Sequence, residues 1–143
     1  MSAFFAFLHH IAAFTLVAGI AVQFMLIRQP LDAALARRLA GTDIVVGISA
    51  GVLLVVGMLR VQYFEKGAAF YQHNAAFIAK MALFVAVALL SIYPTLKFRS
   101  WRTKTPDAAG VAAIRRVLHL ELAGVVLILL CAALMARGIG DFG

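Results

Sequence analysis

Four long apolar blocks, separated by short polar segments, constrain this chain more than any other feature of its sequence. The blocks cover about residues 3–27, 43–59, 75–93 and 117–136. A helix rises about 1.5 Å per residue, so segments of roughly 17 to 25 apolar residues can cross a hydrocarbon core of about 30 Å. Only 13% of the residues are charged, about half the share found in soluble globular domains. The sequence therefore predicts an all-α fold: one integral membrane domain, residues 1–143, built as a four-helix transmembrane bundle with up-down topology.

The first block is interpreted as a span and not as a cleaved signal peptide. No Lys or Arg precedes residue 28, and the apolar stretch is longer than the roughly 7–15 residues of a signal-peptide core. The segment after it runs from Pro30 to Gly41 and has helix signals, with Asp32 in its first turn and Arg37 and Arg38 in its last. It is interpreted either as a short interfacial helix or as the lead-in to the second span.

The second and third spans present small residues that could let two helices approach closely. In the second span Gly47 and Gly51 are four residues apart, a spacing typical of close helix packing in membranes. We expect this face to pack against a stripe of small residues in the third span, Ala75, Ala79, Ala82 and Ala86. Pro94 marks the end or a kink of the third span.

The distribution of basic residues predicts the orientation. Nine of the thirteen lysines and arginines lie in the segments after the first and third blocks. On the opposite side are Arg60, Lys66 and Arg137, and Lys80 lies within the third block. Cytoplasmic loops carry an excess of Lys and Arg, so we expect both termini and the 60–74 segment outside the cytoplasm. This also accounts for the net charge of +7 without a nucleic-acid partner, since basic residues crowded between spans form no groove-tracking surface.

By this topology, one group of polar residues lies near the outer face: His9, His10, Arg60, His73 and Lys80. A lysine inside an apolar span costs about 3 kcal/mol or more unless it finds a partner or reaches the interface. His9 and His10 point about 100° apart on a helix, so only one of them faces the bundle axis squarely. A histidine of the first span and a His or Lys of the third could hold a haem iron axially. The alternative is interfacial histidines and a lysine that extends to the headgroups.

A second group lies at the cytoplasmic end of the fourth span, on the order of 20 Å from the first by helix rise. Glu121 is expected to pair with an arginine of the adjoining loops, or else to relay protons together with His119. Cys131 is the single cysteine, which rules out an intramolecular disulfide, and it is interpreted as a small apolar core residue.

On these residues the chain resembles a bacterial family of small four-span inner-membrane proteins known only as a domain of unknown function. The similarity covers essentially the whole chain. It is carried by His9–Ala12, Leu59–Arg60, Tyr63–Gly67, His73–Asn74, Ala79–Lys80 and Ser91–Leu96. The resemblance implies a multi-pass protein of the bacterial inner (plasma) membrane. Together with the orientation predicted from the basic residues, this puts both termini in the periplasm.

More remotely, the layout is similar to the HemJ-type protoporphyrinogen oxidases and the copper-resistance membrane proteins near them. That resemblance matches their first-span histidine to His9, their Arg-Arg-Leu to Arg37–Leu39 and their Ala-Lys pair to Ala79–Lys80. This chain differs from that group at Ile78, where the group has a histidine.

The sequence therefore favours a membrane protein related to redox chemistry, an oxidoreductase in the enzyme case, that binds haem b, another tetrapyrrole or a quinone in the outer half of the bundle. In this hypothesis His9, His10 and His73 bind the cofactor, and His9 is the metal ligand. Lys80 and Arg60 are the catalytic cations that bind acidic groups. The alternative is a non-catalytic membrane protein: a small transporter, a metal-handling component or a scaffold. The lipid bilayer is a partner in either case, and association into a homo-oligomer is left open.

Overall fold

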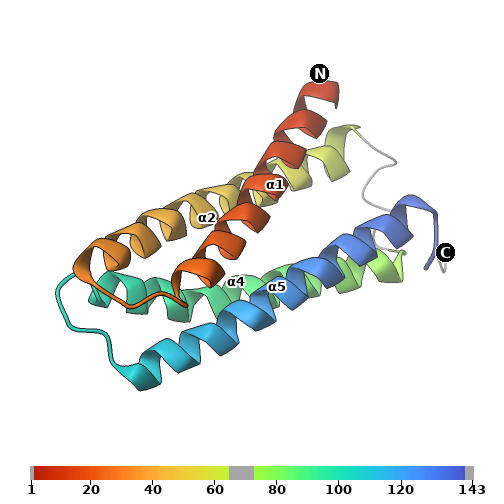
Figure 1. The fold of residues 1–143 in the computed structure, drawn as a ribbon. Helices are drawn as coiled ribbons and strands as arrows, with labels where there is room; N and C mark the ends of the chain where they lie inside the picture. Colours follow the sequence, from red (N-terminus) through yellow and green to blue (C-terminus); the bar gives the residue numbers. More distant parts are fainter. Residues whose placement is uncertain (1, 65–72, 141–143) are drawn as a thin grey trace.

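The computed structural model describes residues 2–64 and 73–140, and this part of the chain is all-α (Figure 1). Its helices are α1 (Ser2–Leu26), α2 (Ala33–Leu59), α4 (Ala75–Ser100) and α5 (Ala108–Ala136), and a π-helical turn, η1 (Arg60–Phe64), extends α2. The four α-helices run alternately up and down, and each is long and apolar enough to cross a membrane. The predicted four-helix bundle is confirmed. Residues 65–67 of the Tyr63–Gly67 motif, with the Lys66 of the charge count, lie outside the described residues.

Three helices, α2, α4 and α5, are longer than their apolar blocks, and a polar residue caps the N-terminus of each. Asp32 is the N-cap of α2, and its carboxylate accepts a hydrogen bond from the Leu35 amide at 2.7 Å. The Pro30–Gly41 segment is therefore the lead-in to the second span and not a separate interfacial helix. Asp107 caps α5 in the same way, accepting from the Gly110 amide at 2.8 Å. As a result α5 begins at Ala108, nine residues before the predicted start of the fourth span.

Pro94 does not end α4, which continues to Ser100. A proline inside a helix removes one backbone donor, and membrane helices tolerate this where hydroxyl side chains satisfy the carbonyls nearby. In α4 the Ser91 hydroxyl donates to the Val87 carbonyl at 3.1 Å, and the Thr95 hydroxyl donates to the Ser91 carbonyl at 2.9 Å. The predicted end of the third span at Tyr93 is thus wrong, because the helix continues through the proline to Ser100.

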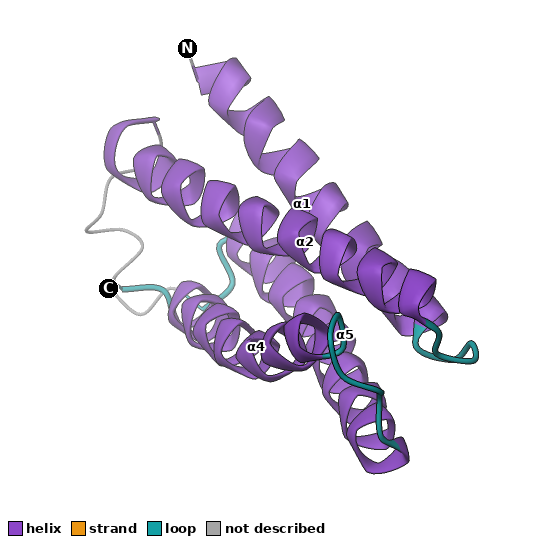
Figure 2. Ribbon diagram, turned by 90° about the vertical axis from the view of Figure 1, so that its left-hand side faces the viewer, coloured by secondary structure: helices purple, strands orange, loops and turns teal. Residues whose placement is uncertain are grey.

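The helices form two hairpins, α1–α2 and α4–α5, which lie side by side within each pair in both ribbon views (Figures 1 and 2). Each hairpin closes around a glycine. A Cβ on Gly19 would lie 2.5 Å from a methyl group of Val46, and a Cβ on Gly124 would lie 2.5 Å from a methyl group of Val87. The predicted contact of Gly47 and Gly51 with the alanine stripe of α4 is wrong, since a Cβ at either glycine would meet no atom within 4 Å.

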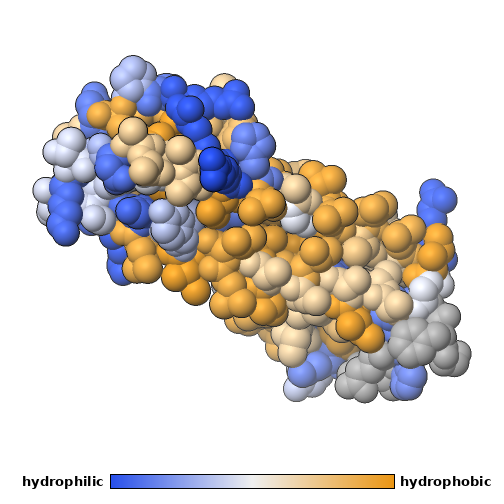
Figure 3. Space-filling view, turned by 90° about the horizontal axis from the view of Figure 1, so that it is seen from below, coloured by the Kyte–Doolittle hydropathy of each residue, from blue (hydrophilic) through white to orange (hydrophobic). Residues whose placement is uncertain are grey.

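The buried core lies toward the end of the bundle with the α1–α2 and α4–α5 connections, here called the basic end. Its members come from all four helices and from Ile27 and Trp101, which directly follow α1 and α4: Leu16, Ile20, Ile27, Leu35, Ala36, Leu39, Val46, Phe98, Trp101, Ile114, Leu118 and Val125. In the space-filling view this end is hydrophilic on its outside, and an apolar belt adjoins it (Figure 3). The core thus joins the hairpins at the basic end and leaves the middle of the bundle less filled.

Direct contacts between the hairpins reinforce this junction. The ring of His119 on α5 meets the ring of Phe24 on α1 edge to face at 4.5 Å, and the guanidinium of Arg28 lies 4.2 Å above the same ring. The Arg115 side chain donates to the Ile27 carbonyl at 3.4 Å. His119 is exposed and held on the outside of the bundle, with its Nδ1 2.9 Å from the Arg115 carbonyl oxygen.

Candidate functional site

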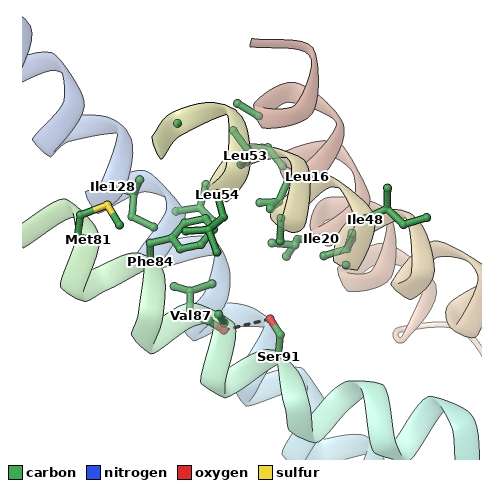
Figure 4. Close-up of a pocket in the computed structure, with 18 of the residues that line it drawn as sticks. Leu16, Ile20, Ile48, Leu53, Leu54, Met81, Phe84, Val87, Ser91 and Ile128 are labelled. Carbon is green, nitrogen blue, oxygen red and sulfur yellow. Dashed lines mark hydrogen bonds between the residues drawn. The ribbon is translucent and has the colours of Figure 1, made fainter. Parts of the chain in front are cut away.

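A cavity of about 670 Å³ lies between the two hairpins and has walls from all four helices (Figure 4). The side chains that face it are mostly apolar, with Leu53 and Leu54 of α2 opposite Phe84 and Met81 of α4. Some lining residues are themselves exposed: Ile48 keeps 63% of its surface accessible and Ile92 of α4 keeps 52%. The cavity is therefore open to the surroundings of the bundle, which for a membrane helix are hydrocarbon.

His9 and Lys80 both line this cavity. His9 comes from α1 and packs on Gly57 of α2, where an added Cβ would lie 3.5 Å from the imidazole Cε1. Lys80 is one turn and a half into α4, and its ammonium lies 5.3 Å from the centre of the Phe77 ring. The imidazole and the ammonium predicted to share a pocket are thus on the walls of the same cavity.

The other predicted residues of the outer group are placed elsewhere. His10 is exposed; its Nδ1 is 2.6 Å from the Ala6 carbonyl oxygen, and its ring stands nearly perpendicular to that of His9 at 6.3 Å. Arg60 is the C-cap of α2 and opens η1, and His73 is exposed in the turn before α4. Among the described residues that line the cavity, none of these three occurs. Their roles remain predictions.

His73 is not part of α4, because the helix begins two residues later than the argument for a face shared with Lys80 requires. The N-cap of α4 is Asn74, whose side chain accepts from the Phe77 amide at 3.0 Å. The helix therefore starts at Ala75, and His73 precedes it in a turn.

The predicted metal ligand His9 is not part of a cluster of three or more metal-ligating side chains in the described chain. Within residues 2–64 and 73–140, no three side chains of His, Cys, Asp or Glu gather closely enough to hold a metal ion. The role of His9 as a metal ligand therefore remains a prediction.

Toward the basic end, the cavity is lined by polar groups that the sequence did not single out. Asp43 of α2 and Ser91, Thr95 and Arg99 of α4 all face it. The Ser91 hydroxyl donates to the Glu121 carboxylate of α5 at 2.7 Å, and Glu121 is only 2% exposed.

The expectation that Glu121 pairs with a loop arginine is wrong. No arginine of the described chain makes an ion pair with it, because Glu121 points inward to α4 while Arg115 and Arg116 are exposed.

The polar residues at the basic end of the cavity could have been identified from the sequence by treating every polar residue within a span as a candidate. Gln23, buried in α1, and Asp43, buried in part in α2, are hydrogen-bonded to each other at 3.3 Å. Polar and ionisable side chains in membrane spans face the bundle interior or a cavity. That rule applies to Gln23 and Asp43 as well as to Lys80.

The family model described as "Predicted membrane protein (DUF2214)" matches residues 1–140 of this chain. No curated protein and no solved structure matches the chain. The interpretation of the cavity therefore depends on the residues that line it.

Proposed function

The chain belongs to this family of membrane proteins, and we propose that it binds a lipid-soluble redox ligand in the cavity between its hairpins. The ligand class is a flat conjugated ring with oxygen-bearing polar groups, either a tetrapyrrole such as haem b or a quinone. The observation that carries the proposal is the cavity itself: an apolar space of about 670 Å³ with an imidazole and an ammonium on its walls. Ligand sites are usually cavities of about 300–1,000 Å³, mostly apolar, with a few convergent polar groups.

The apolar walls suit the ring of such a ligand. Phe84, Leu53 and Leu54 provide the faces that a conjugated ring contacts, and Ile48 and Ile92 stand at exposed positions on the walls. A ligand dissolved in the bilayer would enter between the hairpins without crossing water. This access route suits quinones and tetrapyrroles, which partition into membranes.

The two polar side chains suit the polar groups of the ligand. The Lys80 ammonium would bind a propionate or a quinone oxygen by a charge-assisted hydrogen bond. The His9 imidazole would serve as an axial ligand to haem iron or as a proton donor to a quinone oxygen. The positive-inside rule supports placing these two residues in the outer half of the bilayer of the bacterial inner membrane, since Lys and Arg gather at the opposite, basic end.

The test is ligand binding by the purified protein in nanodiscs. Absorbance spectra of the oxidised and reduced protein, before and after haem is added, detect a tetrapyrrole through its Soret band. Quenching of Trp101 fluorescence by an added ubiquinone analogue detects a quinone. Loss of a charge-assisted hydrogen bond costs about 1.5–3 kcal/mol, so Lys80→Met is expected to weaken binding by about 10- to 100-fold.

Two control variants come from the same chain. Lys97→Met also removes a lysine that lies beside an aromatic ring, 5.9 Å from the centre of Tyr93, but Lys97 does not line the cavity. His119→Ala removes an exposed histidine outside the cavity, for comparison with His9→Ala. Loss of binding in the His9 and Lys80 variants and not in the controls supports the proposal. A protein that binds neither haem nor the quinone, or loses binding equally in all four variants, refutes it and leaves a non-catalytic role.

A further inference from the structure

At the basic end of the cavity, polar side chains of all four helices meet inside the bundle. Gln23 comes from α1, Asp43 from α2, Ser91 from α4 and Glu121 from α5. Gln23 and Glu121 are each 2% exposed. A single polar residue in a membrane helix can be accidental, but four that converge from four helices require a common explanation.

Two separate hydrogen bonds join these groups in pairs. The Gln23 amide donates to the Asp43 carboxylate at 3.3 Å, and the Ser91 hydroxyl donates to the Glu121 carboxylate at 2.7 Å. Thr95, one turn after Ser91 on α4, interacts with the Asp43 carboxyl through its side chain. The charges of Asp43 and Glu121 also act on one another. The two carboxyls thus lie near each other, with two hydroxyls of α4 beside them.

Structural pairing with a cation accounts for Asp43, on whose carboxyl Arg99 acts, but it does not account for Glu121. Carboxylates in membrane spans usually pair with a cation or mark the path of an ion or proton. No basic side chain of the described chain forms an ion pair with Glu121, whose carboxylate accepts a hydrogen bond from a serine hydroxyl. The groups able to carry charge around this cavity are His9 of α1, Asp43 of α2, Lys80 and Arg99 of α4, and Glu121 of α5 behind its wall. His119, two residues before Glu121, packs on Phe24 outside the bundle.

We propose that Asp43 and Glu121 form a proton relay that connects the aqueous phase at the basic end with the cavity, through the hydroxyls of Ser91 and Thr95. Arg99 supports the entry side, because it is exposed at the basic end, lines the cavity and acts on the Asp43 carboxyl. Ser91 supports the exit side, because its hydroxyl both lines the cavity and contacts Glu121. This inference holds whichever ligand occupies the cavity.

The transfer conserves protons and moves no electrons. Protonated Glu121 gives its proton to the Ser91 oxygen, while Ser91 gives its own hydroxyl proton to water or to a basic oxygen of a ligand in the cavity. Ser91 is unchanged and Glu121 becomes a carboxylate. Protonated Asp43 then gives its proton to the Thr95 oxygen, the Thr95 hydroxyl proton passes to the Ser91 oxygen, and the Ser91 proton returns to Glu121. Both hydroxyls are unchanged, and Asp43 takes up a new proton from the water beside Arg99.

The test is infrared difference spectroscopy of the protein in nanodiscs with no ligand added, in which a pH jump is followed through the carbonyl stretch of protonated carboxyls. We expect two such bands that titrate as a coupled pair. Glu121→Gln should remove one band and shift the titration midpoint of the other, and Asp43→Asn should do the converse. Both substitutions keep the shape of the side chain, so near-native helix content by circular dichroism is the folding control.

Ser91→Ala separates a relay from two carboxyls that are merely close. It keeps both carboxyls and removes the hydroxyl between Glu121 and the cavity, so the proton exchange of Glu121 after the pH jump should slow by about tenfold or more. The matched control is Thr42→Val, next to Asp43, whose hydroxyl donates to the Arg38 carbonyl at 2.9 Å and not to a carboxyl. It should leave the exchange rate unchanged. Independent titration of the two carboxyls, or an unchanged rate in Ser91→Ala, overturns the proposal. Failure to bind haem or a quinone does not affect it.

Discussion

Substitution of Gly124 by alanine tests how the α4–α5 hairpin closes. The added Cβ would lie 2.5 Å from a methyl carbon of Val87, about 1 Å short of ordinary van der Waals contact between carbons. Valine in a helix has one strongly preferred side-chain rotamer, so its methyl group cannot turn away cheaply. The helices must therefore separate, or Val87 must adopt a strained rotamer.

The expected size follows from overpacking in well-packed cores, which costs about 1–3 kcal/mol. An opposing term favours alanine over glycine in a helix by up to about 1 kcal/mol. Gly47→Ala measures that opposing term alone, because a Cβ at Gly47 meets no atom within 4 Å. Gly124→Ala should therefore be about 1–3 kcal/mol less stable than Gly47→Ala.

The assay is unfolding by sodium dodecyl sulfate in mixed micelles. Trp101 is the only tryptophan of the chain and is 4% exposed in the core at the basic end, so its fluorescence reports the loss of packing there. A double-mutant cycle with Val87→Ala completes the design. Removing the two methyl groups of Val87 gives the new Cβ room, so the double variant should recover most of the stability lost in Gly124→Ala.

Two results would refute this reasoning. If Gly124→Ala and Gly47→Ala unfold at the same detergent fraction, α5 does not approach α4 at Gly124. If Val87→Ala gives no recovery in the Gly124→Ala background, the steric partner is a different residue. In either case the walls of the cavity would be placed differently.

Three further measurements test the caps and the orientation. The Gly110 amide that donates to Asp107 lowers the pKa of this carboxyl below its ordinary value of 3.8. The cap therefore stabilises the fold fully above pH 3.8, and this stabilisation is lost as the pH falls through the lowered pKa. Asp107→Asn should abolish this pH dependence in acid-unfolding curves. Asn74→Ala removes the hydrogen bond to the Phe77 amide and should cost about 1 kcal/mol in detergent unfolding, whereas Asn74→Ser should cost less. An alkaline phosphatase fusion after Gly143 should be active, as expected for a periplasmic C-terminus, and an inactive fusion of normal abundance would reverse the topology.

The number and approximate place of the helices could be predicted from the sequence, since four apolar blocks of membrane length allow little else. Their ends could not, because the apolar blocks end where the bilayer ends and the helices end at caps. Asp107 starts α5 well before its apolar block, and α4 continues through Pro94 to Ser100. Capping residues are visible in the sequence, and they predict the helix boundaries better than the ends of the apolar blocks do.

The site was predictable in part. His9 and Lys80 line one cavity, as expected of one histidine facing the bundle and a cation within a span. The sequence alone could not exclude His73 from this group, because its exclusion depends on the start of α4 at Ala75, just after the Asn74 cap. It also did not distinguish His9 from His10, since a rotation of 100° identifies one inward residue only when the direction of the neighbouring helix is known.

The predicted pairing of Gly47 with the alanine stripe was wrong for a physical reason. The same reason indicates a better criterion for deciding which face of a span points into the bundle. In a bilayer, lipid tails are as apolar as the side chains of another helix, so small or apolar residues do not reveal which face of a span is inside. Buried polar groups do reveal it, because hydrocarbon offers them no partner. Gln23, Asp43, Ser91 and Glu121 mark the inner face of one helix each, and they meet at the basic end of the cavity. The polar residues of the spans therefore predict the interior of this bundle better than its small-residue stripes do.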